Sequence, residues 1–350
     1  MRAGRLLLLV LLMCTPAWAL ETDQFTVPPQ PLADLGPMLD AKATFELRRV
    51  VAAANATRAT ELKLAAEARS KSAAKLHRDR AYAAVSQQGL AKAYYETIAG
   101  GGVPICKIED WLIDDHTYRA SLLQPMPMGN SVYGGNPFTR PLLVVELSPT
   151  ANLHGQYVGV DKVGHFFQQG HEYYERYIEA RCQGATETDA TRAAIAVGKK
   201  QEHGFYGEAL IGIYSNADLA ANYTGLLFYR NLLEPVTIFG VTYEPMVQWD
   251  GDLLKVTDRA NNDLLKPYIT EHWNEAMNPC HFDGYWRPFV RDRIAKKINT
   301  WMAFNHSTPQ LEAARLQRVR TFDGQDYGHS GFRDVITLLN AGHFDAVASR

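Results

Sequence analysis

The 350-residue sequence has few cysteines, no long apolar stretch after its first residues and no excess of either charge. Its four cysteines form no CxxC pair and no Cys/His spacing typical of structural zinc. After the N-terminus there is no run of roughly 18 apolar residues, which argues against a transmembrane segment in the mature chain. The formal charge of -2, from 36 basic and 38 acidic residues, argues against broad nucleic-acid binding, which needs a basic surface.

Several catalytic signatures are also missing from the sequence. There is no P-loop, no dinucleotide-binding fingerprint and no HExxH zinc motif. Gly328-His329-Ser330-Gly331 departs from a nucleophile elbow, because its second glycine falls one place early. With 46% hydrophobic and 21% charged residues, the composition is that of an ordinary globular protein.

The N-terminus has the pattern of a secretory signal peptide. Arg2 and Arg5 precede an apolar run over residues 6–13, and the AWA at residues 17–19 supplies the small-x-small cleavage signal. Residues 1–19 are therefore predicted to be a leader, and the mature protein to be periplasmic or secreted. Lipidation at Cys14 is the alternative, although Met13 stands where a small residue is normally required.

Export permits a disulfide bond in the mature chain. Cys106, Cys182 and Cys280 remain after the leader, and this odd number leaves one thiol over. Cys106 and Cys280 lie in loop-like contexts and are the preferred pair.

The remaining sequence predicts a mainly α protein with a single multi-helix domain. Residues 20–37 are proline-rich and predict an extended arm, and residues 38–100 predict a helical arm, either one long helix or a hairpin. Residues 101–350 predict a mainly helical core domain. Within it, alternation and turn residues predict a small β-hairpin near 236–257, and a helix is expected over 260–276.

The densest polar pattern lies at residues 160–175, VDKVGHFFQQGHEYYE. On a regular helix Asp161, His165, Gln168 and Glu172 share one face. An apolar face at the same spacing comprises Phe166, Gly170, Tyr173 and Tyr177. A polar face of this kind beside aromatic residues is typical of a helix that lines a cleft.

The following helices supply possible partners for this face. Glu202 and Glu208 lie in KKQEHGFYGEAL, and Asp218 and Asn222 are four residues apart on the next helix. If these helices pack antiparallel on the first, the polar residues converge. The expected cluster contains Asp161, His165, Glu202, Asp218 and Asn222.

Each of these residues also has a structural interpretation. Asp218 completes a capping box with Ser215. His165 fits a buried histidine paired with Asp161, and Glu202 fits a charged helix end. A second polar and aromatic group either borders the same cleft or caps a helix end. It comprises Glu271, His272, Trp273 and Glu275.

Part of this pattern resembles known bacterial families. The order Asp161-Lys162, His165, Glu202, Asp218-Leu219, Asn222 and Gly225 resembles YfiM-like exported proteins and the membrane-embedded VanZ-like pattern. The resemblance covers about residues 160–225. It implies an envelope context and a shared polar cluster, but no reaction.

The leading functional hypothesis is a hydrolase acting on peptidoglycan or another envelope glycan. Glycoside hydrolysis needs a carboxylic acid kept protonated, and usually a second carboxylate. Glu172, Glu202 and Glu208 are the candidate acids, and Asp161 is expected to orient His165 as a general base. The expected substrate-binding residues are Asp218, Asn222, Gln168, Tyr206 and Trp273.

Two alternatives remain open at this stage. Oxygen and imidazole side chains of the cluster also suit a divalent metal, although no cofactor is required by any motif. The other alternative is a non-catalytic periplasmic binding or structural protein, whose cluster is a buried hydrogen-bond network.

Overall fold

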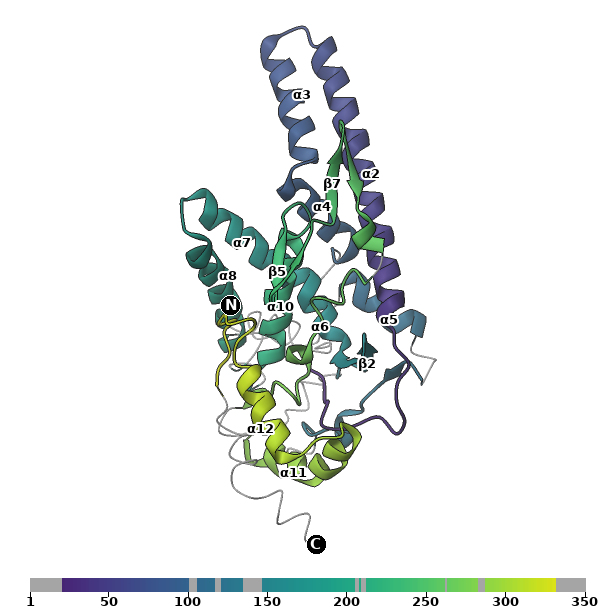
Figure 1. Ribbon diagram of the computed structural model, residues 1–350, viewed down its shortest axis with the longest axis vertical. Coiled ribbons are helices and arrows are strands. Elements are labelled where there is room, and N and C mark those ends of the chain that lie inside the picture. The colour runs from purple at the N-terminus through teal and green to yellow at the C-terminus, as the bar shows by residue number, and fades with distance from the viewer. Residues whose placement is uncertain are drawn as a thin grey trace, which may run out of the picture.

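A computed structural model describes residues 21–100, 106–116, 121–134, 147–204, 208, 212–261, 263–282 and 287–331. These residues form a mainly helical protein with small β elements, as the sequence predicts (Figure 1). The predicted leader, residues 1–19, lies outside the described part of the chain. No helix among the described residues is long and apolar enough to span a bilayer.

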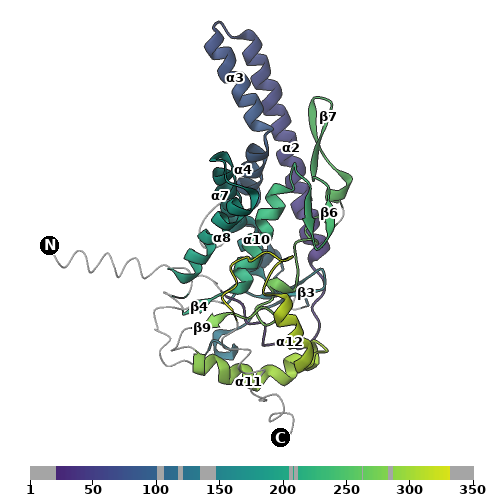
Figure 2. The same cartoon turned by 60° about the vertical axis from the view of Figure 1, so that its left-hand side comes forward.

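The N-terminal helical arm is a hairpin of α2 (Gly36–Glu67) and α3 (Lys71–Ala84), which projects from the body (Figures 1 and 2). Ser70 lies in the turn that joins the two helices, and its hydroxyl caps α3 by accepting a hydrogen bond from the Ala73 N–H at 3.2 Å. All buried residues of α2 lie at or before Ala54. The tip of the hairpin is therefore solvated, while its base packs on the body together with α4 (Gln87–Ile98).

The region 236–257 forms two hairpins where one is predicted. Strands β5 (Val236–Ile238) and β6 (Val241–Tyr243) pair antiparallel, as do β7 (Val247–Asp250) and β8 (Leu253–Val256). Pro245 lies between the hairpins, where its missing N–H and fixed φ interrupt strand pairing. The second hairpin is fixed to α2, because the Asn55 amide bonds both the N–H and the carbonyl of Leu254.

The helix expected over residues 260–276 does not form. The described residues hold only two short 3-10 turns, η3 (Asp258–Asn261) and η4 (Glu271–Trp273). Pro267 interrupts the apolar pattern and excludes a continuous helix. Thr270 then starts η4 by accepting the His272 N–H at 3.3 Å. The segment instead follows an irregular path that carries Glu275 into the interior.

The remaining helices and strands complete the described fold. The helices are α5 (Lys107–His116), α6 (Val160–Gly164), α7 (Gly170–Cys182), α8 (Glu187–His203), α10 (Asn216–Arg230), α11 (Arg287–Phe304) and α12 (Pro309–Arg318). The strands β1 (Leu123–Gln124), β2 (Thr150–Leu153) and β3 (Gln156–Gly159) form one antiparallel sheet. Strands β4 (Ile213–Tyr214) and β9 (His281–Phe282) pair separately, and η1 (Met128–Asn130) is a 3-10 turn.

Helix α10 is the central element of the core, with every residue from Asn216 to Tyr229 buried. It crosses the chain of α6 and α7 at two glycines. A Cβ added at Gly225 would lie 2.1 Å from the Phe166 carbonyl oxygen and 2.8 Å from the Gly170 Cα. This close backbone approach brings the side chains of α10 against those of α6.

The preferred disulfide between Cys106 and Cys280 is not formed. Cys106, Cys182 and Cys280 are all free thiols; Cys106 and Cys280 are buried and Cys182 is exposed. Cys106 belongs to the main apolar core, whereas Cys280 packs in a second one beside Phe282 and Trp301. Because the two thiols pack in separate apolar cores, the pairing predicted from their loop-like contexts does not form.

Candidate functional site

The helix that carries the polar pattern is irregular, and this decides which side chains meet. Helix α6 passes into a π-helical turn (η2, His165–Gln169) before α7 begins. A π-helical turn contains more residues than an α-helical turn and so shifts every later position around the axis. Asp161 and His165 therefore face α10, whereas Gln168 and Glu172 turn away from them.

Lys162 lies at the centre of the polar cluster and has no exposed surface. Its ammonium lies 2.7 Å from Asp161 Oδ2 and also contacts Asp218 Oδ1 and Glu275 Oε1. Burial disfavours the charge, but these carboxylates outweigh it and raise the pKa of Lys162 well above its usual value. The lysine is therefore an ammonium ion held by three carboxyl groups.

His165 is bonded at both ring nitrogens. Its Nε2 lies 3.1 Å from Asp218 Oδ2, and its Nδ1 lies 3.1 Å from the Asn222 amide. Burial opposes the charge, but the Asp218 carboxylate overcomes it and raises the pKa of His165 to about 9. This shift favours the imidazolium at neutral pH, whereas the general-base role predicted for His165 needs the neutral ring.

The Asn222 amide can match either charge state of this ring. With its oxygen toward Nδ1, it accepts the proton of the imidazolium. Turned by 180°, its nitrogen faces Nδ1 and the carbonyl oxygens of His165 and Asp218, the latter two at 3.2 Å. The turned amide fits the neutral ring, with Nδ1 as the acceptor.

Glu202 and Asp218 are buried carboxyl groups with opposite pKa shifts. Burial raises the pKa of Glu202 to about 8, and the nearby Asp218 carboxylate adds to the effect. Burial acts the same way on Asp218, but His165 and Lys162 outweigh it and lower its pKa below the usual range. One group is thus a neutral acid and the other an anion at neutral pH.

The contacts of Glu202 and Asp218 favour a role beyond helix capping. The Ser215 hydroxyl accepts the Asp218 N–H at 3.2 Å and so caps α10, while the Asp218 carboxylate faces Lys162 and His165. Glu202 Oε2 accepts the Ser215 N–H at 3.0 Å. Glu202 is 5% exposed and so is not part of a solvated helix end.

Asp161 belongs to the cluster but has different partners from those predicted. It contacts Lys162, and its Oδ1 accepts the Thr22 hydroxyl at 2.8 Å. The carboxylate that holds His165 is Asp218, because α10 lies directly beside the ring. The orienting role predicted for Asp161 therefore belongs to Asp218.

Other predicted site residues lie away from the cluster. Glu172 is bonded to Gln201 Nε2 at 2.9 Å and lines a surface hollow of about 290 Å³ with Gln168. Glu208 lies 2.9 Å from His203 Nδ1, and Trp273 is buried, with its Nε1–H bonded to Thr224. Trp273 therefore has no free face for a sugar ring. Tyr206 falls outside the described residues.

Four members of the cluster were not singled out as site residues from the sequence: Lys162, Glu275, Thr22 and Glu109. Glu275 contacts Lys162, and the sequence placed it only in the polar and aromatic group with Glu271, His272 and Trp273. Burial raises the pKa of Glu275 to about 7. Thr22 comes from the predicted extended arm. Glu109 of α5 packs against Gly164, because a Cβ added at this glycine would lie 2.3 Å from the carboxyl carbon of Glu109. Burial raises the pKa of Glu109 to about 7. Lys162 appeared in the sequence only through the Asp161-Lys162 pair of the family resemblance, and Thr22 and Glu109 gave no signal.

The cluster itself is a poor site for a metal ion. Ligand atoms of Asp161, Asp218 and Glu275 lie within 4.8 Å of one another, a spacing suited to a cation. The Lys162 ammonium contacts all three and already supplies that cation. What the arrangement offers is a proton donor, Glu202, near the cationic side chains of His165 and Lys162. No family model, curated protein or solved structure matches the chain.

Proposed function

We propose that the protein is an exported hydrolase of the cell envelope, with Glu202 as its general acid. The observation that carries the proposal is a pair of buried carboxyl groups in one cluster, of which Asp218 is paired with Lys162 and His165 while Glu202 is not. Burial therefore raises the pKa of Glu202 to about 8, whereas the two cations lower that of Asp218. Two carboxyl groups whose environments drive their pKa values apart are the usual arrangement for carboxyl acid–base catalysis.

The contacts of Glu202 define its part in the reaction. The Ser215 N–H occupies Oε2, so the acidic proton is assigned to Oε1. From there it passes to the oxygen of the leaving group as the bond from that oxygen to the sugar carbon breaks. A water molecule forms the new bond to this carbon, and the proton that it gives up restores Glu202. The cationic His165 and Lys162 both favour the glutamate anion that remains. They act as positioning residues, because each lowers the cost of losing the proton.

His165 is the cluster member closest to solvent. Its side chain is 17% exposed, compared with 5% for Asp218 and none for Lys162. Substrate is therefore expected to approach along the His165 side. The imidazolium, fixed between Asp218 and Asn222, presents a positive edge there.

The proposed substrate is peptidoglycan or another envelope glycan. Glycosidic bonds need a protonated carboxylic acid near neutral pH, which the raised pKa of Glu202 provides. The predicted leader supports an envelope location. The polar residues that carry the YfiM-like resemblance also lie in this cluster. They are Asp161, Lys162, His165, Glu202, Asp218 and Asn222.

Digestion of purified sacculi tests the proposal. The exported protein should release soluble glycan fragments, and Glu202→Gln should reduce the rate at least about 100-fold, since general acid catalysis contributes about 10²–10⁴-fold. Glu172→Gln is the matched control, because Glu172 lies outside the cluster. Fragment release at the wild-type rate by Glu202→Gln, or none by the wild type on sacculi of any type, overturns the proposal.

A non-catalytic role is the second candidate, favoured by the complete burial of Lys162 among three carboxyl groups. In that case the cluster fixes α6, α10 and the extended N-terminal segment that carries Thr22 to one another. Truncating Glu202 to alanine would then lower the free energy of unfolding by about 1–3 kcal/mol with no enzymatic activity to lose. Unfolding and digestion measured on the same variants separate the two candidates.

A further inference from the structure

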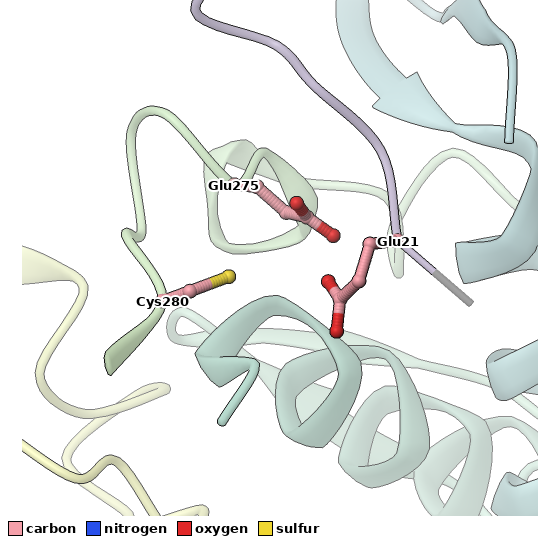
Figure 3. A group of neighbouring side chains, drawn as sticks. All are labelled: Glu21, Glu275 and Cys280. Atoms are coloured by element: carbon pink, nitrogen blue, oxygen red, sulfur yellow. The ribbon is translucent and has the colours of Figure 1, made fainter. Parts of the chain in front are cut away.

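A second group of buried ligand-type side chains adjoins the Lys162 cluster. Glu21 begins the described chain, Glu275 follows η4, and Cys280 precedes β9. Their exposed fractions are 3%, 1% and 5%, and one ligand atom from each lies within 4.8 Å of the others. Figure 3 shows the three side chains extending from separate segments into a shared space.

Glu21 supplies the observation that indicates a ligand. Its Oε2 is fully buried and has no hydrogen-bond partner among the described residues. A buried polar atom without a partner costs about 1–3 kcal/mol, and more if the group is charged. A buried carboxyl group with such an atom, beside another carboxyl group and a thiol, needs a proton or a cation.

The neighbouring group gives an internal comparison. Asp161, Asp218 and Glu275 have the same close spacing, and the Lys162 ammonium contacts each of them. Lys162 reaches Glu275 at Oε1, while Glu275 Oε2 accepts the Tyr133 hydroxyl at 2.9 Å. Glu21 and Cys280 make no ion pair with Lys162 comparable to those three contacts.

We infer that Glu21, Glu275 and Cys280 bind one divalent transition-metal ion of the zinc type. The thiol determines the class, because Mg²⁺ and Ca²⁺ prefer oxygen-only sites whereas Zn²⁺ accepts sulfur together with carboxylate oxygen. Three protein ligands leave the fourth tetrahedral position to water. The site goes beyond the proposed hydrolase function, since Glu202 and His165 are not ligands.

Cobalt binding tests this site directly in the purified protein after removal of metal. Co²⁺ should bind in a one-to-one ratio and give a thiolate-to-cobalt charge-transfer band, which Cys280→Ser abolishes. Cys182→Ser is the matched control and should retain the band, because Cys182 is exposed on α7. Glu21→Gln keeps the shape of the side chain and should weaken Zn²⁺ binding at least about tenfold.

X-ray absorption of the zinc-loaded wild type does not depend on whether a variant folds. The expected spectrum contains one sulfur at about 2.3 Å together with oxygen ligands. A spectrum without sulfur, no stoichiometric binding, or cobalt binding unchanged in Cys280→Ser overturns the inference. Sacculus digestion by the metal-free protein is a separate readout, so a failed metal site leaves the proposed hydrolase to be judged independently.

Discussion

Replacing Lys162 by methionine removes the central charge of the cluster at nearly constant side-chain volume. Lys162 has no exposed surface, and its ammonium contacts Asp161, Asp218 and Glu275. The substitution leaves carboxylates buried without their counter-ion. Breaking a buried ion pair in this way costs about 3–5 kcal/mol, a large share of the roughly 5–15 kcal/mol that stabilises a typical domain.

Equilibrium urea unfolding, followed by circular dichroism and tryptophan fluorescence, measures this loss. Lys75→Met is the matched control, because Lys75 pairs with Asp79 at 2.6 Å on an exposed face of α3. An exposed pair of this spacing contributes only about 0.3–0.5 kcal/mol. The reasoning is refuted if Lys162→Met loses less than about 1 kcal/mol, or no more than the Lys75 variant.

The pH dependence of the loss provides an independent check. Lys162 and His165 lower the pKa of Asp218 against the effect of burial, so ionised Asp218 stabilises the wild type until the pH falls through that lowered pKa. Without Lys162, Asp218 takes up its proton at a higher pH. The stability difference between wild type and variant should therefore narrow as the pH falls from neutral.

A double variant tests whether charge is the cause. Asp161→Asn keeps an oxygen for the Thr22 hydroxyl but removes one negative charge beside Lys162. Combined with Lys162→Met, it should cost less than the sum of the two single changes, by about 0.5–3 kcal/mol. Additive losses would mean that packing, not charge, explains the effect of Lys162→Met.

Two further predictions concern the helix crossing and the histidine. Gly225→Ala would place a Cβ 2.1 Å from the Phe166 carbonyl oxygen and should destabilise the protein by about 1–3 kcal/mol or more, whereas Gly129→Ala meets no atom within 4 Å and should be nearly neutral. Equal thermal stability of the two variants would contradict the close crossing. Because the pKa of His165 is raised from 6.5 to about 9, its stabilising contribution should be complete below 6.5 and lost as the pH rises through about 9. In unfolding experiments, the difference in the free energy of unfolding between wild type and His165→Gln should decrease over that pH interval. A difference that stays constant with pH would contradict the charge assigned to His165.

Local sequence signals identified most of the helical structure. The helical arm, the polar segment at residues 160–175 and α10 all follow apolar spacing and caps, such as the Ser215 hydroxyl at the start of α10. The same spacing failed at residues 260–276, where Pro267 outweighs the apolar pattern. Periodicity reports burial, but a single breaker decides whether the backbone can continue.

The candidate site could be predicted only in part. Regular helical spacing placed Asp161 and His165 together and brought Glu202, Asp218 and Asn222 into consideration. It also placed Gln168 and Glu172 on the same face, which the π-helical turn prevents. The π-helical turn lies where the helix packs closely on the Gly225 backbone, a tertiary contact that residue spacing does not report.

The sequence by itself determined the mainly helical character of the chain and several of the residues from which a polar cluster could be built. The tertiary structure alone decided that Lys162 is the centre of the cluster and that Asp218, rather than Asp161, holds His165. It also brought Glu21 and Glu275, some 250 residues apart in the chain, to the same buried position. The physical reason is that charge pairing and burial depend on distances in space, which residue spacing along the chain specifies only within one regular element.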